Sequence, residues 1–248
     1  MNELSKMKYK WETGFRDANT GVVMPGFDLK PHVLMSMYGI PRSMVEFTLE
    51  DLDPVNEKQL LIMNRMWEMV NDLNSAQTMV ISGGNGTGKT ILGSAFVHTL
   101  ARLAATMNFR DYNPLYVDEA SLLLMLGGYG SDNGFRQVAY NVGMLVIDEF
   151  AMVQWTPGDK RKIEQVLNVR YGNKLKFVLL TNRKTDELYG RQGGGEPIFS
   201  SQIRSRLLPG YNIELTGPDL RRSNRRTQQR DSRVEQMERD EQENDLPF

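Results

Sequence analysis

The chain has 248 residues, of which 40% are hydrophobic and 25% are charged, and this balance predicts one compact domain with attached segments. Cysteine is absent and only two histidines are present, so disulfides, thiolate metal sites and a cysteine nucleophile are excluded. No stretch reaches the roughly 18 uncharged apolar residues of a membrane span, and the first residues lack the apolar core of a signal peptide. We therefore expect a cytoplasmic protein.

The net charge of −1 hides a strong polarity near the C-terminus. Six arginines and one aspartate give residues 221–233 a charge of +5, whereas six acidic residues and one arginine give residues 234–248 a charge of −5. A segment with so few large apolar side chains cannot bury enough surface to offset the entropy lost on ordering. We predict that residues 222–248 form a disordered charged tail.

Glycine and proline breakers interrupt residues 1–40, which are expected to form an irregular arm with one short helix at most. From Glu57 to Val70 apolar residues recur every three or four positions, which predicts an amphipathic helix. Short apolar runs then alternate with helical patterns. Strands are expected at residues 79–81, 115–117, 144–147, 177–180 and 211–215, and helices at 92–103, 120–125 and 159–171. This alternation predicts an α/β fold, with a five-stranded parallel sheet covered by helices on both faces.

A glycine-rich motif lies between the first strand and the following helix, and it matches the pattern G-x-x-x-x-G-K-[ST]. In such a loop, backbone amides at a helix N-terminus surround phosphate groups. The lysine is expected to reach the β and γ phosphates, and the threonine hydroxyl to ligate Mg²⁺. We predict that ATP and Mg²⁺ bind here, through Gly83, Gly84, Asn85, Gly86, Thr87, Gly88, Lys89 and Thr90.

The third strand ends in two carboxylates, Asp148 and Glu149. Asp148 is expected to hold Mg²⁺ through water, and Glu149 to act as the general base that polarises the attacking water. The fourth strand is followed by Asn182, whose amide is placed to orient the same water if the two strands are neighbours. An ordinary turn residue is the alternative for Asn182.

These motifs, together with Ser205-Arg206-Leu207 and Asp219-Leu220-Arg221, resemble the AAA+ ATPases of the DnaC/DnaI helicase-loader and IstB transposition-helper group over residues 40–222. The resemblance implies an AAA+ P-loop NTPase core at residues 41–221 with a reduced or absent C-terminal lid. It also implies individual roles: adenine contact for Ile40 and Pro41, sensor 1 for Asn182, arginine finger towards a neighbouring subunit for Arg206, and sensor 2 for Arg221. Arg204 competes with Arg206 on spacing alone.

In function, the resemblance implies an ATPase that loads or remodels a replicative helicase on single-stranded DNA, in a bacterial or phage-infected cell. A homo-oligomer is expected, since a finger that acts on a neighbour requires one, and residues 1–40 are the candidate helicase contact. An IstB-like transposition helper is the alternative within the group. A P-loop kinase for a small molecule shares Lys89 and Thr90, although the pair Asp148-Glu149 favours water as the acceptor. An adaptor that binds ATP and barely hydrolyses it is a further alternative.

Two other segments are candidates for contact with partners. Trp155, Lys160, Arg161 and Lys162 combine an aromatic ring with three cations, a pattern that suits single-stranded DNA; a solvated basic helix start is the alternative. The terminal residues Asp245, Leu246, Pro247 and Phe248 resemble the tip of bacterial single-stranded-DNA-binding proteins (SSB), which would dock on a protein that reads that tip. An accidental acidic end, or one that folds back on the arginines before it, is the alternative.

Overall fold

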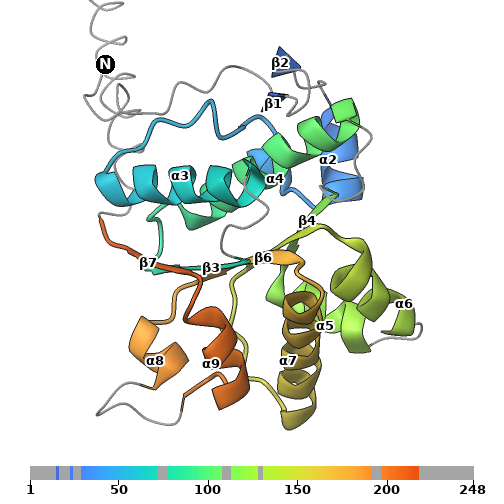
Figure 1. The fold of residues 1–248 in the computed structure, drawn as a ribbon, viewed down its shortest axis with the longest axis vertical. Coiled ribbons are helices and arrows are strands. Elements are labelled where there is room, and N and C mark those ends of the chain that lie inside the picture. The colour runs from blue at the N-terminus through green and yellow to red at the C-terminus, as the bar shows by residue number, and fades with distance from the viewer. Residues whose placement is uncertain are drawn as a thin grey trace, which may run out of the picture.

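The computed structural model describes residues 15–16, 23–24, 29–71, 77–107, 113–127, 131–190 and 197–217. Its centre is a five-stranded parallel sheet with the strand order β4-β5-β6-β3-β7, drawn nearly edge-on in Figure 1. The strands are β3 (Thr78–Gly83), β4 (Pro114–Asp118), β5 (Met144–Asp148), β6 (Lys176–Thr181) and β7 (Tyr211–Leu215). All five strands expected from the sequence are therefore confirmed. A separate antiparallel pair joins β1 (Phe15–Arg16) to β2 (Val23–Met24).

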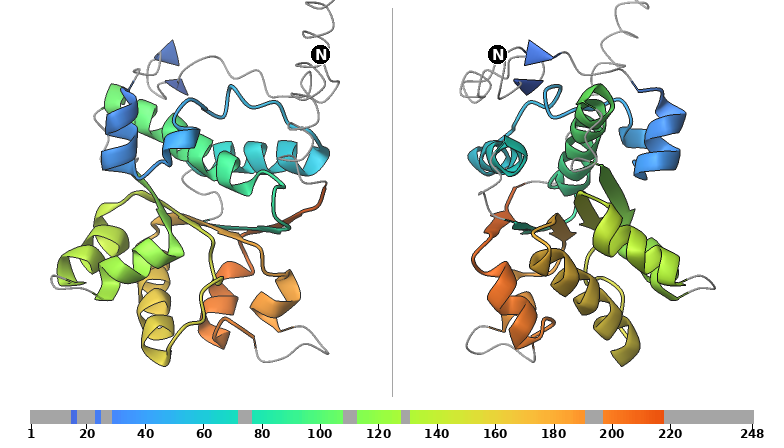
Figure 2. Two further views of the ribbon diagram at one scale, coloured as in Figure 1. Left: turned by 180° about the vertical axis from the view of Figure 1, so that it is seen from behind. Right: turned by 45° about the vertical axis from the view of Figure 1, so that its right-hand side comes forward.

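Helices cover both faces of the sheet, as expected (Figures 1 and 2). One face carries α2 (Pro31–Tyr38), the short 3-10 helix η1 (Arg42–Met44), α3 (Glu57–Asn71) and α4 (Lys89–Met107). The other carries α5 (Glu119–Gly127), α6 (Ser131–Arg136), the π-helical turn η3 (Gln137–Asn141), α7 (Pro157–Gly172), α8 (Thr185–Tyr189) and α9 (Ser201–Leu207). None of the helices in the described part of the chain is long and apolar enough to cross a membrane.

The sheet separates two apolar cores, because successive side chains of a strand point to opposite faces. In β3, Met79 and Ile81 pack under α3 and α4, whereas Val80 packs against the helices of the other face. The apolar stripe expected on α3 is confirmed, since Met63, Met66, Trp67 and Val70 are all buried in the first core. The central strands are apolar throughout because helices cover both of their faces.

The folded body begins earlier than the sequence indicates, because α2 belongs to it. Leu34 and Tyr38 are 1% and 7% exposed and pack in the same core as α4. The helix begins at Pro31, which suits a first helical position, and it ends at Gly39 in a left-handed conformation with φ of 71°. The expected start of the core near Ile40 was therefore wrong. The helices α6, η3, α8 and α9 were also not expected.

A fully buried cation, Arg170 of α7, fastens the starts of two neighbouring strands. Its guanidinium donates to the carbonyl oxygens of Val138, Val142, Gly143 and Lys176, at 2.7, 2.8, 3.0 and 2.6 Å. Burial lowers the pKa of Arg170 to about 9, so the group remains protonated at neutral pH. β5 and β6, which it joins at their beginnings, carry the candidate site at their other ends.

Candidate nucleotide site

The glycine-rich loop connects β3, near the middle of the sheet, to the N-terminus of α4. Glycine is required at position 83, where φ is 151° and a Cβ atom would lie 2.3 Å from the carbonyl oxygen of Leu215. Lys89 is 7% exposed, and its ammonium donates to the carbonyl oxygens of Gly83 and Gly84 at 2.8 and 2.7 Å. The loop therefore encloses the ammonium of Lys89. It stands between a strand and a helix, which is the context that the phosphate-loop motif requires.

Gln59 of α3 holds the loop from behind, a contact that the sequence analysis missed. Its side-chain amide donates to the carbonyl oxygen of Thr87 at 3.0 Å, and its own oxygen accepts from the amide of Val55 at 2.9 Å. Gln59 is 5% exposed, and its hydrogen bond to Thr87 is buried. The sequence offers one signal, a polar glutamine within the apolar stripe of an amphipathic helix. This signal does not identify the residue that the glutamine contacts.

Asp148 lies at the tip of β5 and meets two hydroxyl groups at a single carboxylate oxygen. Thr90 donates to Oδ2 at 2.8 Å, and the phenol of Tyr116 in β4 donates to the same atom. Burial and the neighbouring Asp148 raise the pKa of Tyr116, so its phenol stays protonated as a donor. A carboxylate and a hydroxyl side by side supply the oxygen ligands that Mg²⁺ prefers, so the residues fit that ion. No group of three or more His, Asp or Glu that could hold a metal ion occurs within the described ranges.

Glu149 and Asn182 follow the tips of the neighbouring strands β5 and β6. The pairing of Ile147 with Leu179 confirms that these strands are adjacent, which was the condition placed on Asn182. The side-chain amide of Asn182 donates to Asn85 Oδ1 in the phosphate loop at 2.7 Å. Glu149 has a left-handed backbone with φ of 53° and is exposed. Its amide donates to Asp148 Oδ1 at 2.7 Å.

These side chains line one cavity of about 350 Å³. The geometry thus brings together the phosphate loop, both carboxylates and Asn182, which lie far apart in the sequence. Ile40 is 2% exposed and packs in the core, and η1 contributes Met44 to the cavity wall where the sequence suggested Ile40 and Pro41. The lining residues are Met44, Asn85, Gly86, Gly88, Lys89, Thr90, Ile91, Asp148, Glu149, Thr181 and Asn182.

The two candidate finger arginines lie on α9, and neither is among the residues that line the cavity. Arg204 donates to the backbone oxygen of Tyr189 at 2.8 Å. Arg206 donates to Asn168 of α7, and its guanidinium carbon lies 5.5 Å from the centre of the Tyr171 ring. Action of either arginine on a neighbouring subunit stays a prediction. Arg221, the charged tail at 222–248 with its tip, and the expected reduction of the lid fall outside the described residues.

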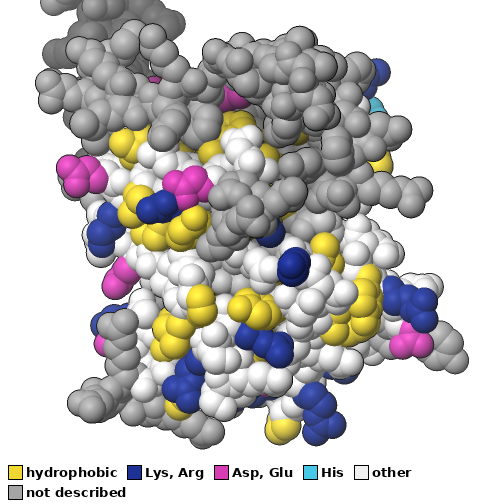
Figure 3. Space-filling view, viewed as in Figure 1, with side chains coloured by type: hydrophobic (Ala, Val, Ile, Leu, Met, Phe, Trp, Pro, Cys, Tyr) yellow, Lys and Arg dark blue, Asp and Glu magenta, His cyan; other side chains and the backbone are white. Residues whose placement is uncertain are grey.

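Trp155 is tied to the protein interior by both its ring and its N–H group. The indole donates to Glu119 Oε1 at 2.8 Å and packs edge-on against Phe150, with ring centres 5.4 Å apart. Only its remaining, partly exposed surface is left for a nucleic-acid base. Of the cations that follow, Arg161 is exposed, whereas Lys160 and Lys162 are half-buried. On the face of the molecule drawn in Figure 3, Lys and Arg side chains are mixed with apolar ones over the half that contains α7 and α9.

The strand order, the phosphate loop after β3 and the carboxylate pair after β5 define the AAA+ P-loop fold, which confirms the fold class expected from the sequence. The structure is similar to a crystal structure of DnaI, with a TM-score of 0.58 and 19% identity, and the match covers 75% of this chain and 98% of the chain in that structure. It is also similar to the DnaC helicase loader, with a TM-score of 0.50 and 20% identity, covering 71% of this chain and all of that one.

In sequence, the chain is 26% identical over 178 residues to a Mycobacterium tuberculosis protein that is named for ATP binding and for its place in an insertion sequence. The match covers 70% of this chain and 68% of that relative. No family model matches the chain. The resemblance to the DnaC/DnaI and IstB group is thus confirmed at the level of fold and overall similarity.

Proposed function

We propose that this chain is an ATPase that binds ATP with Mg²⁺ and acts in DNA replication as a DnaC-like helicase loader. One observation carries the ATPase proposal: Lys89, Thr90, Asp148, Glu149 and Asn182 line the same cavity. These five residues come from the carboxyl ends of three different strands, β3, β5 and β6, so their convergence requires the folded sheet. A phosphate-binding loop facing two carboxylates and an amide suits transfer of a phosphoryl group to water.

In the proposed reaction, the amides of the phosphate loop and the ammonium of Lys89 hold the β and γ phosphates. Lys89 exchanges its present carbonyl partners for phosphate oxygens, which are stronger acceptors because they are charged. Glu149 takes the proton of the attacking water, and the Asn182 amide orients that water towards the γ phosphorus. Thr90 and Asp148 are the side chains that would hold Mg²⁺, an ion that supplies charge neutralisation between the phosphates.

The proposed partners are a replicative helicase, single-stranded DNA and further copies of this chain. The similarity to the DnaC helicase loader supports the first, and the cations at 160–162 support the second. Assembly with further copies is proposed because Arg206, on α9, is not among the residues that line the cavity of its own chain, so as a finger it would act on a neighbouring copy. The terminal Asp245–Phe248 is proposed to dock on a protein that reads the SSB tip. The test is competition between a peptide of residues 240–248 and an SSB tail peptide for binding to a protein that reads the SSB tip. Failure to compete at low salt would exclude that docking.

Two substitutions test the ATPase proposal by separating binding from turnover. Lys89→Ala removes the only side-chain cation of the phosphate loop, so ATP binding should be lost. Glu149→Gln keeps the shape of the site and removes the base, so binding should be retained while turnover falls by about 10²–10⁴-fold. Binding is measured with a fluorescent ATP analogue and turnover by phosphate release, with and without single-stranded DNA. Wild-type turnover in Glu149→Gln would refute the general-base assignment.

An IstB-like transposition helper is the second candidate, and one observation favours it. The relative at 26% identity is named for its place in an insertion sequence. Both candidates share the ATPase site, so turnover does not distinguish them. Co-purification does: a helicase loader should retain the replicative helicase of its host, whereas a transposition helper should retain the transposase encoded beside it.

A further inference from the structure

The turn after β5 carries the proposed general base on a strained backbone. Glu149 and Ala151 have φ angles of 53° and 61°, left-handed values that residues with a side chain rarely adopt. Such conformations persist where the surrounding structure holds them, and they cluster at functional sites. The contacts that hold this turn therefore set the position of the Glu149 carboxylate on the cavity wall.

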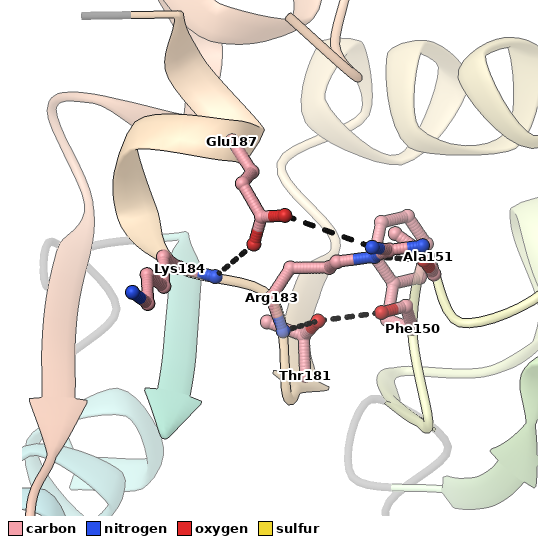
Figure 4. Close-up of polar contacts among 6 residues, drawn as sticks. All are labelled: Phe150, Ala151, Thr181, Arg183, Lys184 and Glu187. Atoms are coloured by element: carbon pink, nitrogen blue, oxygen red, sulfur yellow. Dashed lines mark hydrogen bonds and ion pairs between the residues drawn. The ribbon is translucent and has the colours of Figure 1, made fainter. Parts of the chain in front are cut away.

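The last residue of β6 and the segment that follows it hold the turn by hydrogen bonds (Figure 4). The hydroxyl of Thr181 donates to the carbonyl oxygen of Phe150 at 2.6 Å, and it accepts from the amide of Arg183 at 3.0 Å. The guanidinium of Arg183 then reaches back, and its Nε donates to the carbonyl oxygen of Ala151 at 2.9 Å. One short segment thus contacts two successive carbonyl groups of the turn.

The direction of Arg183 is itself fixed by the first turn of α8. Its NH1 lies 3.6 Å from Glu187 Oε1, and the other oxygen of Glu187 accepts from the amide of Lys184 at 2.8 Å. The Arg183 side chain is 39% exposed, so the ion pair contributes mainly to orientation. A planar guanidinium can serve Ala151 with one nitrogen and Glu187 with another, which a lysine ammonium cannot match in geometry.

A buried carboxylate from another element, α5, holds the same turn. Glu119, at the start of α5, is 0% exposed, and its two oxygens accept from the amides of Ala151 and Val153 at 2.7 and 2.9 Å. The amide and the carbonyl of Ala151 are therefore held by different elements, α5 and the segment after β6. Release of either group allows Ala151 to relax towards a right-handed conformation.

We infer that Arg183 is a positioning residue for Glu149, and this inference rests on the proposed ATPase function. By holding the carbonyl of Ala151, Arg183 keeps the left-handed turn whose first residue presents the base to the cavity. Arg183 also directly follows Asn182, so one segment carries the amide proposed to orient the water and the side chain that holds the turn of the proposed base. Arg183 itself is not among the residues that line the cavity.

The experiment compares Arg183→Ala and Arg183→Lys with Lys184→Ala, which removes an exposed cation from the next position. Turnover and ATP affinity are measured separately, by phosphate release and by a fluorescent ATP analogue. Misplacement of a catalytic group by about 1 Å can cost on the order of 10²-fold, so Arg183→Ala should lower kcat by about 10- to 100-fold. ATP affinity should change less than about twofold, Arg183→Lys should recover part of the loss, and Lys184→Ala should match the wild type.

A double substitution shows whether Arg183 acts through Glu149. In single-turnover reactions on a Glu149→Gln background, Arg183→Ala should cause no further loss, because the base is already absent. An additional loss there, an unchanged kcat in Arg183→Ala, or ATP affinity weakened tenfold would each overturn the inference. Absence of turnover in the wild-type chain would instead overturn the proposed ATPase function, and the inference with it.

Discussion

Replacement of Arg170 by methionine tests how the sheet that carries the site is held together. The substitution keeps a long side chain in the same space and removes the donors for four carbonyl oxygens. A net loss of roughly 1 kcal/mol for each hydrogen bond gives about 4 kcal/mol in the free energy of unfolding. Methionine needs no desolvation, which offsets part of this loss, so we expect a decrease of about 3–4 kcal/mol. That is a large share of the roughly 5–15 kcal/mol that stabilises a typical domain.

The matched control is Arg161→Met, the same chemical change on an exposed position of the same helix. It should alter the free energy of unfolding by no more than about 0.5 kcal/mol. Arg170→Lys should fall between the two, because an ammonium has three donors for four acceptors. The assay is urea denaturation followed by circular dichroism, with stability taken from the midpoint at constant slope. Equal midpoints for Arg170→Met and Arg161→Met would refute the role of the buried guanidinium.

Three further predictions concern the proposed site and its partners. Tyr116→Phe removes a hydroxyl that holds Asp148, the proposed Mg²⁺ ligand. The Mg²⁺ concentration for half-maximal turnover should therefore rise about 10- to 100-fold, and an unchanged Mg²⁺ titration would contradict this. Mixtures of Arg206→Ala with Lys89→Ala subunits should recover some turnover, because the first variant supplies an intact nucleotide site and the second supplies the finger. No recovery in confirmed assemblies would argue against action between subunits. Changing residues 160–162 together to alanine should weaken single-stranded DNA binding and flatten its salt dependence, and unchanged affinity would place the DNA surface elsewhere.

The parts of the site that could be predicted from sequence are those with fixed spacing. The phosphate loop and Asp148-Glu149 have such fixed spacing, because the backbone of a strand followed by a tight turn allows few arrangements of these residues. Short apolar runs were sufficient for all five strands, and they are clearest in β3, β5 and β6, which are buried on both faces.

The supporting residues have no such signature. Gln59, Tyr116, Glu119 and Arg183 act through contacts between elements that are distant in the chain. Their partners are mostly backbone atoms, which every residue possesses, so no pattern of residue types marks them. A short helix was allowed for in residues 1–40, but the place of α2 in the core was missed for a different reason: its eight residues are bounded by Pro31 and Gly39, and so short a segment shows little periodicity.

The position of β3 in the sheet has a consequence for synthesis of the chain. β3 precedes the phosphate loop, yet its two neighbours are β6 and β7, and Met79 pairs with Val178 on one side and Tyr211 on the other. The ribosome therefore releases β3 long before either neighbour exists, and long-range parallel pairing of this kind is slow. A nascent chain that stops before β6 should not retain ATP, even though it already contains every residue of the phosphate loop. Nucleotide binding can thus report, during translation, that β6 and β7 have paired on either side of β3.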